Sequence, residues 1–294
     1  MVCVDPLAKT FVVQDYDLGA TLVSGQAFRW RLQDESWVGV IGSRWVKLRQ
    51  AGPSLVAETA EPVQDWTWLT NYLQLEVDLS AVLSTFPPEP AMHDAVTACR
   101  GLRLLRQDPW ECLASFILSS TKQIVQIRQI ISLLCSRYGA AVPVGTDQPP
   151  AHIFPTPGRL ACLSEAELRA CKMGFRAPFL LSTARSIAQG ELDLSALGQM
   201  PLEAARAELL KLEGVGRKIS DCVLLFAFGY QGAFPVDVWI MKFLRHHYFR
   251  RRRVSLRQLQ EFAASHFGPY AGYAQQYLFH YARVQMARAT LPNL

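Results

Sequence analysis

Short apolar runs separated by glycines mark the first part of the chain. Between Thr10 and Val56, the residues Val, Leu, Trp and Phe gather in short stretches, and the breaks between them fall at Gly19, Gly25, Gly39, Gly42 and Gly52. This spacing is typical of strands joined by hairpin turns. The pattern predicts an antiparallel sheet in this part of the chain.

Beyond the proline-rich run at 87–90, apolar residues recur at helical intervals instead. The predicted helical regions cover residues 110–137, 165–190, 201–212, 219–229, 236–248 and 255–289, and one helix is expected to begin near Ser120. A loop rich in Pro, Gly and Ala at 139–157 separates two helical groups. The patterns predict an α+β protein in two parts, an α/β portion over residues 1–95 and a mostly helical portion over residues 96–294.

Length and composition restrict the class of protein. Half of the 294 residues are apolar, which is enough to form one large core or two adjoining ones. No stretch reaches the roughly 20 continuous apolar residues of a membrane span, and charged residues interrupt the N-terminal region where a signal peptide would be apolar. We expect a soluble monomer, cytoplasmic and associated with the nucleoid in a bacterium, or nuclear in a eukaryote.

Charge is distributed unevenly along the chain. The net charge is +5, but residues 1–95 hold 6 Lys and Arg against 12 Asp and Glu, whereas the remainder holds 24 against 13. The second part is therefore expected to face a polyanion. The charge alone fits RNA, DNA and acidic lipid equally.

The cysteines carry no metal or disulfide pattern. They are odd in number and scattered, without close pairs, at Cys3, Cys99, Cys112, Cys135, Cys162, Cys171 and Cys222. Neither structural disulfides nor bound zinc is expected.

The stretch at 212–222 carries most of the chemical information, because it reads as a helix, a glycine turn and a second helix. Gly214 and Gly216 permit unusual backbone angles, and the second helix offers free amides to a phosphate. Unpaired carbonyls of Leu210, Leu212 and Val215 would suit a cation bridging to DNA. For an isolated Gly-Val-Gly, a plain turn between helices would be the better interpretation.

Lys218 and Asp237 favour a catalytic interpretation. A lysine in the first turn of a helix lies near the positive end of the helix dipole, which disfavours its protonated form and suits a nucleophilic amine. Asp237 begins a new apolar helix. Taken alone it would be an ordinary N-cap, but a carboxylate there would also stabilise positive charge developing on a sugar.

The run Leu-x-Gly-Val-Gly-x-Lys at 212–218, followed by Pro-Val-Asp-Val at 235–238, resembles the helix-hairpin-helix signature of DNA glycosylases of the 8-oxoguanine type. The stretches 24–30, 108–113 and 272–279 resemble the recognition loop, first helical block and base pocket of that family. The resemblance implies a TBP-like N-terminal sheet before a helical glycosylase domain. It also implies a bifunctional glycosylase and abasic-site lyase acting on 8-oxoguanine in double-stranded DNA, with no required cofactor and no iron-sulfur cluster.

The resemblance assigns roles residue by residue. Lys218 would attack C1′ and form a Schiff base, with Asp237 assisting base departure. The Gly25 carbonyl would accept the N7 proton that distinguishes 8-oxoguanine from guanine, and Gln275 would read the Watson-Crick edge. Phe279 and Cys222 would sandwich the flipped base, although core packing explains both without the resemblance.

Some positions depart from the family pattern. Thr121 stands within a run where asparagines are common, and Gln126 replaces an arginine that reads the orphaned cytosine. Arg176 matches the second such arginine, and Phe175 fits the wedge that fills the gap in the duplex. Trp239 stands where a histidine is common. The run at 250–253 would touch phosphates or simply be a solvated helix end.

Two other functions compete with this interpretation. Glycosylases for alkylated bases typically lack the lysine, and those for thymine glycol or adenine mismatches typically carry a four-cysteine cluster near the C-terminus; this chain has Lys218 and no cysteine after Cys222. A non-catalytic DNA-binding module would use the hairpin without needing Lys218 and Asp237.

Overall fold

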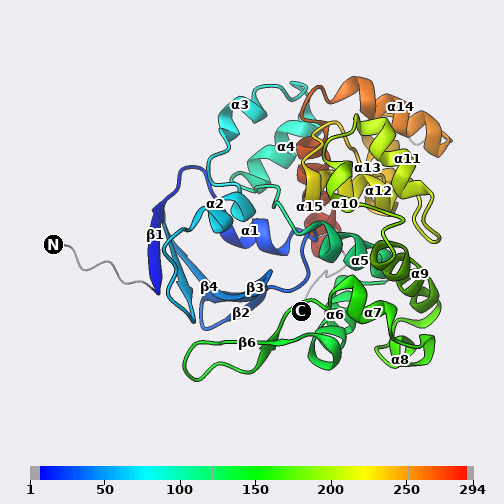
Figure 1. Ribbon diagram of the computed structural model, residues 1–294. Helices are drawn as coiled ribbons and strands as arrows, with labels where there is room; N and C mark the ends of the chain where they lie inside the picture. Colours follow the sequence, from blue (N-terminus) through cyan, green and yellow to red (C-terminus); the bar gives the residue numbers. More distant parts are fainter. Residues whose placement is uncertain (1–6, 121, 251, 290–294) are drawn as a thin grey trace.

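The computed structural model describes residues 7–120, 122–250 and 252–289 and places a twisted sheet at one end and helices over the rest (Figure 1). The sheet is antiparallel throughout, with strand order β1-β5-β4-β3-β2. Its strands are β1 (Ala8–Val12), β2 (Arg31–Gln33), β3 (Ser36–Ile41), β4 (Arg44–Ala51) and β5 (Ser54–Thr59). The predicted α+β class and N-terminal antiparallel sheet are confirmed.

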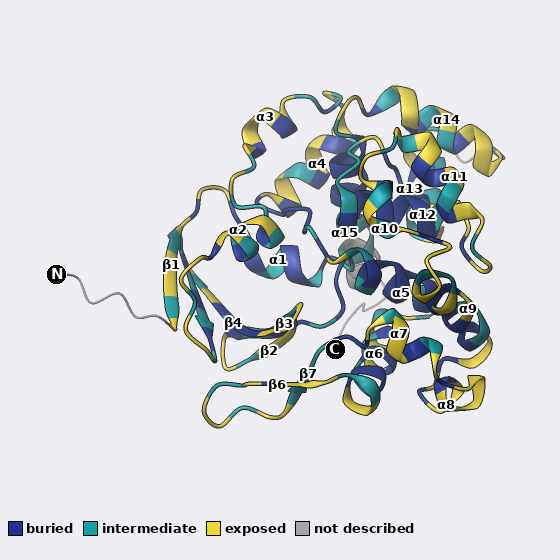
Figure 2. Ribbon diagram, viewed as in Figure 1, coloured by how far each residue is buried: buried dark blue, intermediate teal, exposed yellow. Residues whose placement is uncertain are grey.

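One face of the sheet is covered by α1 (Leu18–Val23) and α2 (Thr67–Leu73). Burial alternates along β5, where Leu55 and Ala57 are fully buried between half-buried neighbours. These side chains pack with Leu22 of α1 and Leu69 of α2 in a core of their own. In Figure 2 the buried residues of the sheet and of these helices are dark blue, and the exposed ones are yellow.

The helices of the larger part enclose a second core. They are α3 (Leu79–Leu83), α4 (Pro90–Cys99), α5 (Pro109–Ser119), α6 (Ile124–Tyr138), α7 (Pro157–Ala161), α8 (Glu165–Arg169), α9 (Ala177–Ala188), α10 (Leu194–Leu197), α11 (Leu202–Leu210), α12 (Arg217–Val223), α13 (Val238–His247), α14 (Leu256–His266) and α15 (Ala271–Ala289). Helix α15 packs against α4, α13 and α14. Residue 95, where the sequence places the domain boundary, lies inside α4, whose buried Met92 and Ala95 belong to the helical core.

Several predicted helical regions are interrupted, and the backbone explains where. Ser120 and Gln123 have extended ψ angles of 126° and 152°, so residues 110–137 divide into α5 and α6. The prediction of a helix beginning near Ser120 was therefore wrong, because α6 begins at Ile124. The regions 165–190 and 255–289 are also interrupted. Gly174 and Gly268 lie at these breaks, with left-handed φ angles of +63° and +70° that do not continue a helix.

The loop predicted at 139–157 contains a small two-stranded ladder of β6 (Ala141–Val142) and β7 (Ala151–His152). Residues 224–228 continue α12 as one π-helical turn. Among the described residues, no helix is long and apolar enough to cross a membrane. The six described cysteines are all free.

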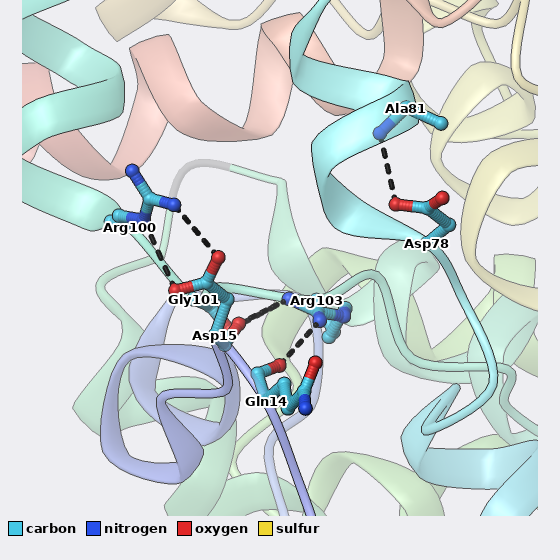
Figure 3. Close-up of polar contacts among 7 residues, drawn as sticks. All are labelled: Gln14, Asp15, Asp78, Ala81, Arg100, Gly101 and Arg103. Carbon is cyan, nitrogen blue, oxygen red and sulfur yellow. Dashed lines mark hydrogen bonds and ion pairs between the residues drawn. The ribbon is translucent and has the colours of Figure 1, made fainter.

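Two arginines link the residues that follow β1 to the segment after α4, as Figure 3 shows. Arg100 forms two hydrogen bonds with the Asp15 carboxylate, at 3.2 and 2.7 Å. The buried Arg103 donates to the main-chain carbonyls of Asp15, at 2.7 Å, and Gln14, at 3.3 Å. Arg103 is 2% exposed, and these hydrogen bonds go to main-chain carbonyls. They fix the chain that follows β1 to the segment that follows α4.

Candidate active site

The hairpin expected at 212–218 is present between α11 and α12. The Leu212 carbonyl accepts a hydrogen bond from the Val215 amide at 3.1 Å. Gly214 has φ +78°, and a Cβ there would lie 2.5 Å from the Phe179 ring, so both the backbone angle and the space require glycine. Gly216 precedes α12 without a side-chain cap, which leaves the first amides of that helix for an anion.

A buried ion pair connects the two arms of the hairpin. Arg206 on α11 donates from Nε to Oδ1 of Asp221 on α12 at 2.7 Å, and both side chains are nearly inaccessible to solvent. Burial raises the pKa of the Asp221 carboxyl, and the Arg206 charge opposes that shift. The ion pair therefore fixes the angle between α11 and α12, and with it the position of every residue on the first turn of α12.

Replacing Asp221 with alanine is expected to lower the free energy of unfolding by about 3 kcal/mol, because Arg206 would lose its buried partner and keep only the exposed carboxylate of Glu203. The matched control is Glu208→Ala, which removes the carboxylate of an exposed pair with Lys211 and is expected to cost less than about 1 kcal/mol. Urea unfolding of both variants measures the difference. Equal costs would show that the buried pair does not hold the hairpin together.

Lys218 lies on the first turn of α12 and points toward the end of α5. Its amine donates to Ser119 Oγ at 3.1 Å and lies 4.9 Å from the centre of the Phe116 ring. The thiol of Cys222 lies one turn further along α12, where the Lys218 charge acts to lower its pKa against the larger effect of burial. The side chain is half-buried and held in one orientation by contacts from two helices.

Asp237 caps α13, as the simpler interpretation of the sequence requires. Its Oδ1 accepts the Ile240 amide at 2.8 Å. Burial raises the pKa of the Asp237 carboxyl, while the hydrogen bond from Ile240 and the charge of Lys218 act in the opposite direction. The two predicted residues are therefore near enough for the Lys218 charge to act on this carboxyl, and the capping role of Asp237 does not exclude a catalytic one.

The loop that holds Gly25 is fixed by the buried side chain of Gln26. Its Nε2 donates to the Arg103 carbonyl at 2.8 Å, and its Oε1 accepts the Leu105 amide at 2.8 Å. The side chain of Gln107 donates to the carbonyl of Gln26 at 2.8 Å. Gly25 itself has φ +84°, a left-handed conformation that a residue with a side chain rarely adopts.

One predicted base-recognition residue, Phe279, lies directly against this loop. A Cβ on Gly25 would lie 3.2 Å from Cε1 of Phe279, so these two residues are neighbours. Gln275 is 3% exposed, and its Oε1 has no hydrogen-bond partner among the described residues. Burial raises the pKa of the Cys222 thiol to about 12, which keeps it neutral. Phe279 packs partly against the helical core, so core packing and base stacking both remain open for it.

Three residues of the site escaped the sequence prediction. Ser119 and Phe116 contact the Lys218 amine from α5, and Arg283 on α15 lies against Gly25 and Phe279. Ser119 and Phe116 lie in the run Phe-Ile-Leu-Ser-Ser at 116–120, directly before Thr121, so their position beside a family-like segment was a weak signal. No motif in the sequence pointed to Arg283.

Phe175, predicted to fill the gap in the duplex, and Arg176, predicted to read the orphaned cytosine, lie in contrasting environments. Phe175 is 55% exposed, as a wedge would be, whereas Arg176 is 2% exposed. The Arg176 guanidinium lies 4.2 Å from the centre of the Phe175 ring and donates to the Met173 carbonyl. Arg176 would have to leave this position to read an orphaned base. Gln126 is exposed, and its Oε1 accepts the Gln123 amide at 3.1 Å in a capping box.

The remaining predicted contacts with DNA stay predictions. Thr121 lies outside the described residues. Trp239 is half-buried, with Lys242 Nζ 5.9 Å from its ring centre. The described arginines of the run at 250–253 are exposed between α13 and α14. Among the described residues, no group of three or more His, Cys, Asp or Glu side chains is arranged to hold a metal ion.

Two family models together match most of the chain. Residues 10–113 match the N-terminal domain of 8-oxoguanine DNA glycosylases, and residues 114–267 match the HhH-GPD superfamily of base excision DNA repair proteins. The second match begins within α5 and includes the hairpin, Lys218 and Asp237.

Individual relatives agree with the family models. A probable N-glycosylase/DNA lyase of Methanothermobacter thermautotrophicus is 36% identical over 68% of this chain and 69% of its own length. The N-glycosylase/DNA lyase of Arabidopsis thaliana is 31% identical over 89% of this chain and 76% of its own length. A Clostridium acetobutylicum 8-oxoguanine glycosylase/lyase, solved with DNA containing cytosine opposite the lesion, superposes with a TM-score of 0.88 at 29% identity, covering 96% of this chain and all of that one. With a hairpin, a lysine and a carboxylate in one site, the chain belongs to the 8-oxoguanine DNA glycosylase family within the HhH-GPD superfamily of base excision DNA repair proteins.

Proposed function

We propose that the protein excises 8-oxoguanine from duplex DNA and then cleaves the abasic strand through a Schiff base on Lys218. The observation that carries this proposal is the position of the Lys218 amine, which donates to Ser119 Oγ at 3.1 Å and whose charge acts to lower the pKa of the half-buried Asp237 carboxyl against the larger effect of burial. A non-catalytic DNA-binding module would have no use for this pair. Membership of the glycosylase family supports the same conclusion.

The chemistry proceeds in two stages. Lys218 Nζ attacks C1′ of the damaged nucleotide, and the bond between C1′ and N9 breaks, with its electron pair leaving on the base, which takes up a proton. The amine loses a proton and the sugar ring opens, so that a Schiff base joins Nζ to C1′. Removal of a C2′ proton then expels the 3′ phosphate, and water hydrolyses the Schiff base to release the lysine.

Asp237 acts at the reaction steps in which positive charge develops. A carboxylate beside the sugar stabilises the positive charge that develops as the base departs. Because a side-chain amine supplies the nucleophile, this route requires no cofactor, and we propose none. The carbonyls of Leu210, Leu212 and Val215 stay a proposed site for a cation bridging to DNA. The expectation that all three carbonyls are unpaired was wrong for Leu212, which accepts the Val215 amide at 3.1 Å and would offer the cation its second lone pair.

Lesion recognition is assigned to the loop and to α15. The Gly25 carbonyl accepts the N7 proton of 8-oxoguanine, which guanine lacks, and the unpartnered Gln275 Oε1 accepts from the Watson-Crick edge. Phe279 and the neutral Cys222 thiol form the two faces of the base site. Leaving a buried polar group unpaired is costly, so the unpartnered Gln275 oxygen is consistent with a ligand that completes it.

The direct test is single-turnover base release from matched duplexes carrying 8-oxoguanine, guanine, thymine glycol or 3-methyladenine at one position. We expect release of 8-oxoguanine alone, followed by strand cleavage and a borohydride-trapped complex with DNA. Release of an alkylated base or an oxidised pyrimidine instead would move the protein to another specificity within the superfamily. Binding without release would favour the non-catalytic module.

Preference for the opposite base is expected to be weak. A bidentate arginine contact gives about 1–3 kcal/mol of discrimination, so an enzyme with Gln126 in place of one arginine should lose roughly 10- to 100-fold of its preference for cytosine. Excision of 8-oxoguanine opposite C, T, G and A measures this preference. Gln126→Arg should sharpen it, because position 126 is exposed on the first turn of α6. A strong preference in the unmodified protein would show that another side chain has replaced the missing arginine.

A further inference from the structure

Arg283 reaches the proposed base site from α15 with part of its guanidinium unused. Its Nη2 donates to the Val23 carbonyl at 2.5 Å, next to the recognition loop. Its Nη1 is buried and has no hydrogen-bond partner among the described residues. A Cβ built on Gly25 would lie 2.9 Å from this same Nη1. An unsatisfied cationic donor therefore lies against the glycine whose carbonyl is assigned to the lesion.

The surroundings of Arg283 also favour an incoming acceptor. The guanidinium carbon lies 5.6 Å from the centre of the Phe279 ring, so the donor is beside the face proposed to stack on the base. No carboxylate forms an ion pair with Arg283 among the described residues, and Asp237 is the only acidic group that raises its pKa. Burial and the neighbouring Arg128 charge lower the pKa of Arg283. A hydrogen-bond acceptor on the flipped nucleotide would satisfy the unpartnered Nη1 donor and stabilise the buried charge.

The chemistry of the lesion indicates which acceptor is within reach. If N7-H points at the Gly25 carbonyl, the two carbonyl oxygens of 8-oxoguanine, O6 and O8, lie on either side of it. A donor next to Gly25 therefore faces one of them. We propose that Arg283 is a specificity-determining residue that donates a hydrogen bond from Nη1 to a carbonyl oxygen beside N7 of the flipped base.

This inference rests on the proposed function, and its test separates the two. Wild type and Arg283→Met are compared in single-turnover excision of 8-oxoguanine and, in the same preparations, in β-elimination at a preformed abasic site. Arg283→Met is expected to slow excision about 10- to 100-fold, the usual range for losing a hydrogen bond to a charged group, and to leave β-elimination within about 2-fold. Retained β-elimination also shows that the variant is folded. The matched control is Arg128→Met, which removes the neighbouring charge without contacting Gly25 and should change excision by less than about 3-fold.

A third substrate distinguishes a contact with the base from a contact with the 5′ phosphate. It carries 8-oxoguanine next to a methylphosphonate that removes the charge of the 5′ phosphate. A base contact predicts the same Arg283→Met defect on this substrate, whereas a defect that vanishes on it would assign Arg283 to the phosphate and overturn the proposal.

Equal excision by wild type and Arg283→Met would overturn this inference alone. A wild-type protein that neither releases 8-oxoguanine nor forms a trapped complex would overturn the proposed function as well.

Discussion

Replacing Lys218 with glutamine is expected to eliminate the borohydride-trapped complex with 8-oxoguanine DNA and to reduce base release and strand cleavage below detection. Glutamine occupies nearly the same volume and still offers a donor to Ser119, so the geometry at the end of α5 should survive. It lacks an amine that can form an imine with C1′. Affinity for the duplex should fall by no more than about 10-fold, since only one cation is lost from the phosphate-binding surface.

Lys122→Gln is the matched control, because it removes the same charge from the segment between α5 and α6. Its trapped complex should form at nearly the wild-type rate. Trapping that persists in Lys218→Gln would assign the Schiff base to another amine, and trapping lost equally in both variants would indicate a general effect of charge on DNA binding.

Replacing Asp237 with asparagine is expected to slow base excision on the order of 10²–10³-fold, the usual effect of removing one well-placed electrostatic group from a transition state. Asparagine retains the side-chain oxygen that caps α13, so the fold should persist. Single-turnover excision measures the loss. A near-normal rate would leave Asp237 with its capping role only.

The stability of Asp237→Asn gives an independent check with a defined sign. Burial raises the folded-state pKa of Asp237, so the folded protein binds its proton more tightly than the unfolded chain does. Stability from this group is then fully present below the ordinary aspartate pKa and declines as pH rises through the raised value. Asp237→Asn should therefore melt at or above the wild-type temperature at pH 7, and the difference should shrink as the pH is lowered toward the ordinary range of aspartate. A variant that is markedly less stable at pH 7 would show that the ionised carboxylate stabilises the fold.

The sequence predicted residues whose signal is local and missed those defined by tertiary contacts. Lys218 and Asp237 lie in short motifs with a glycine turn and a helix cap, which can be recognised without a structure. Ser119 is 99 residues from Lys218, and only the packing of α12 on α5 brings their side chains together. Arg283 lies in α15 beyond the stretch 272–279 that resembles the base pocket, and its proximity to Gly25 depends on where α15 passes the recognition loop.

Helix boundaries failed for a related reason. Periodicity continues from residue 110 to 137, because α5 and α6 both place apolar faces on the same core. The interruption is set by the extended backbone at Ser120 and Gln123, which apolar spacing does not encode. Arg176 shows the same limit, since its position in the sequence fits a base-reading side chain while its burial depends on how it packs beside Phe175.

The hydrogen bonds of Gln26 have a consequence for the time the enzyme spends on undamaged DNA. The amide nitrogen and the amide oxygen of Gln26 both bond to the main chain of residues 103–105, so the loop is fixed and the Gly25 carbonyl has little freedom to turn away. The N7 atom of ordinary guanine carries a lone pair in place of a proton, so a fixed carbonyl would face it with like partial charge. Each normal guanine that enters the site would then be expelled quickly, shortening its dwell time. If the Gly25 carbonyl reads N7 as proposed, a stiff loop would let the enzyme scan a longer stretch of DNA between two lesions.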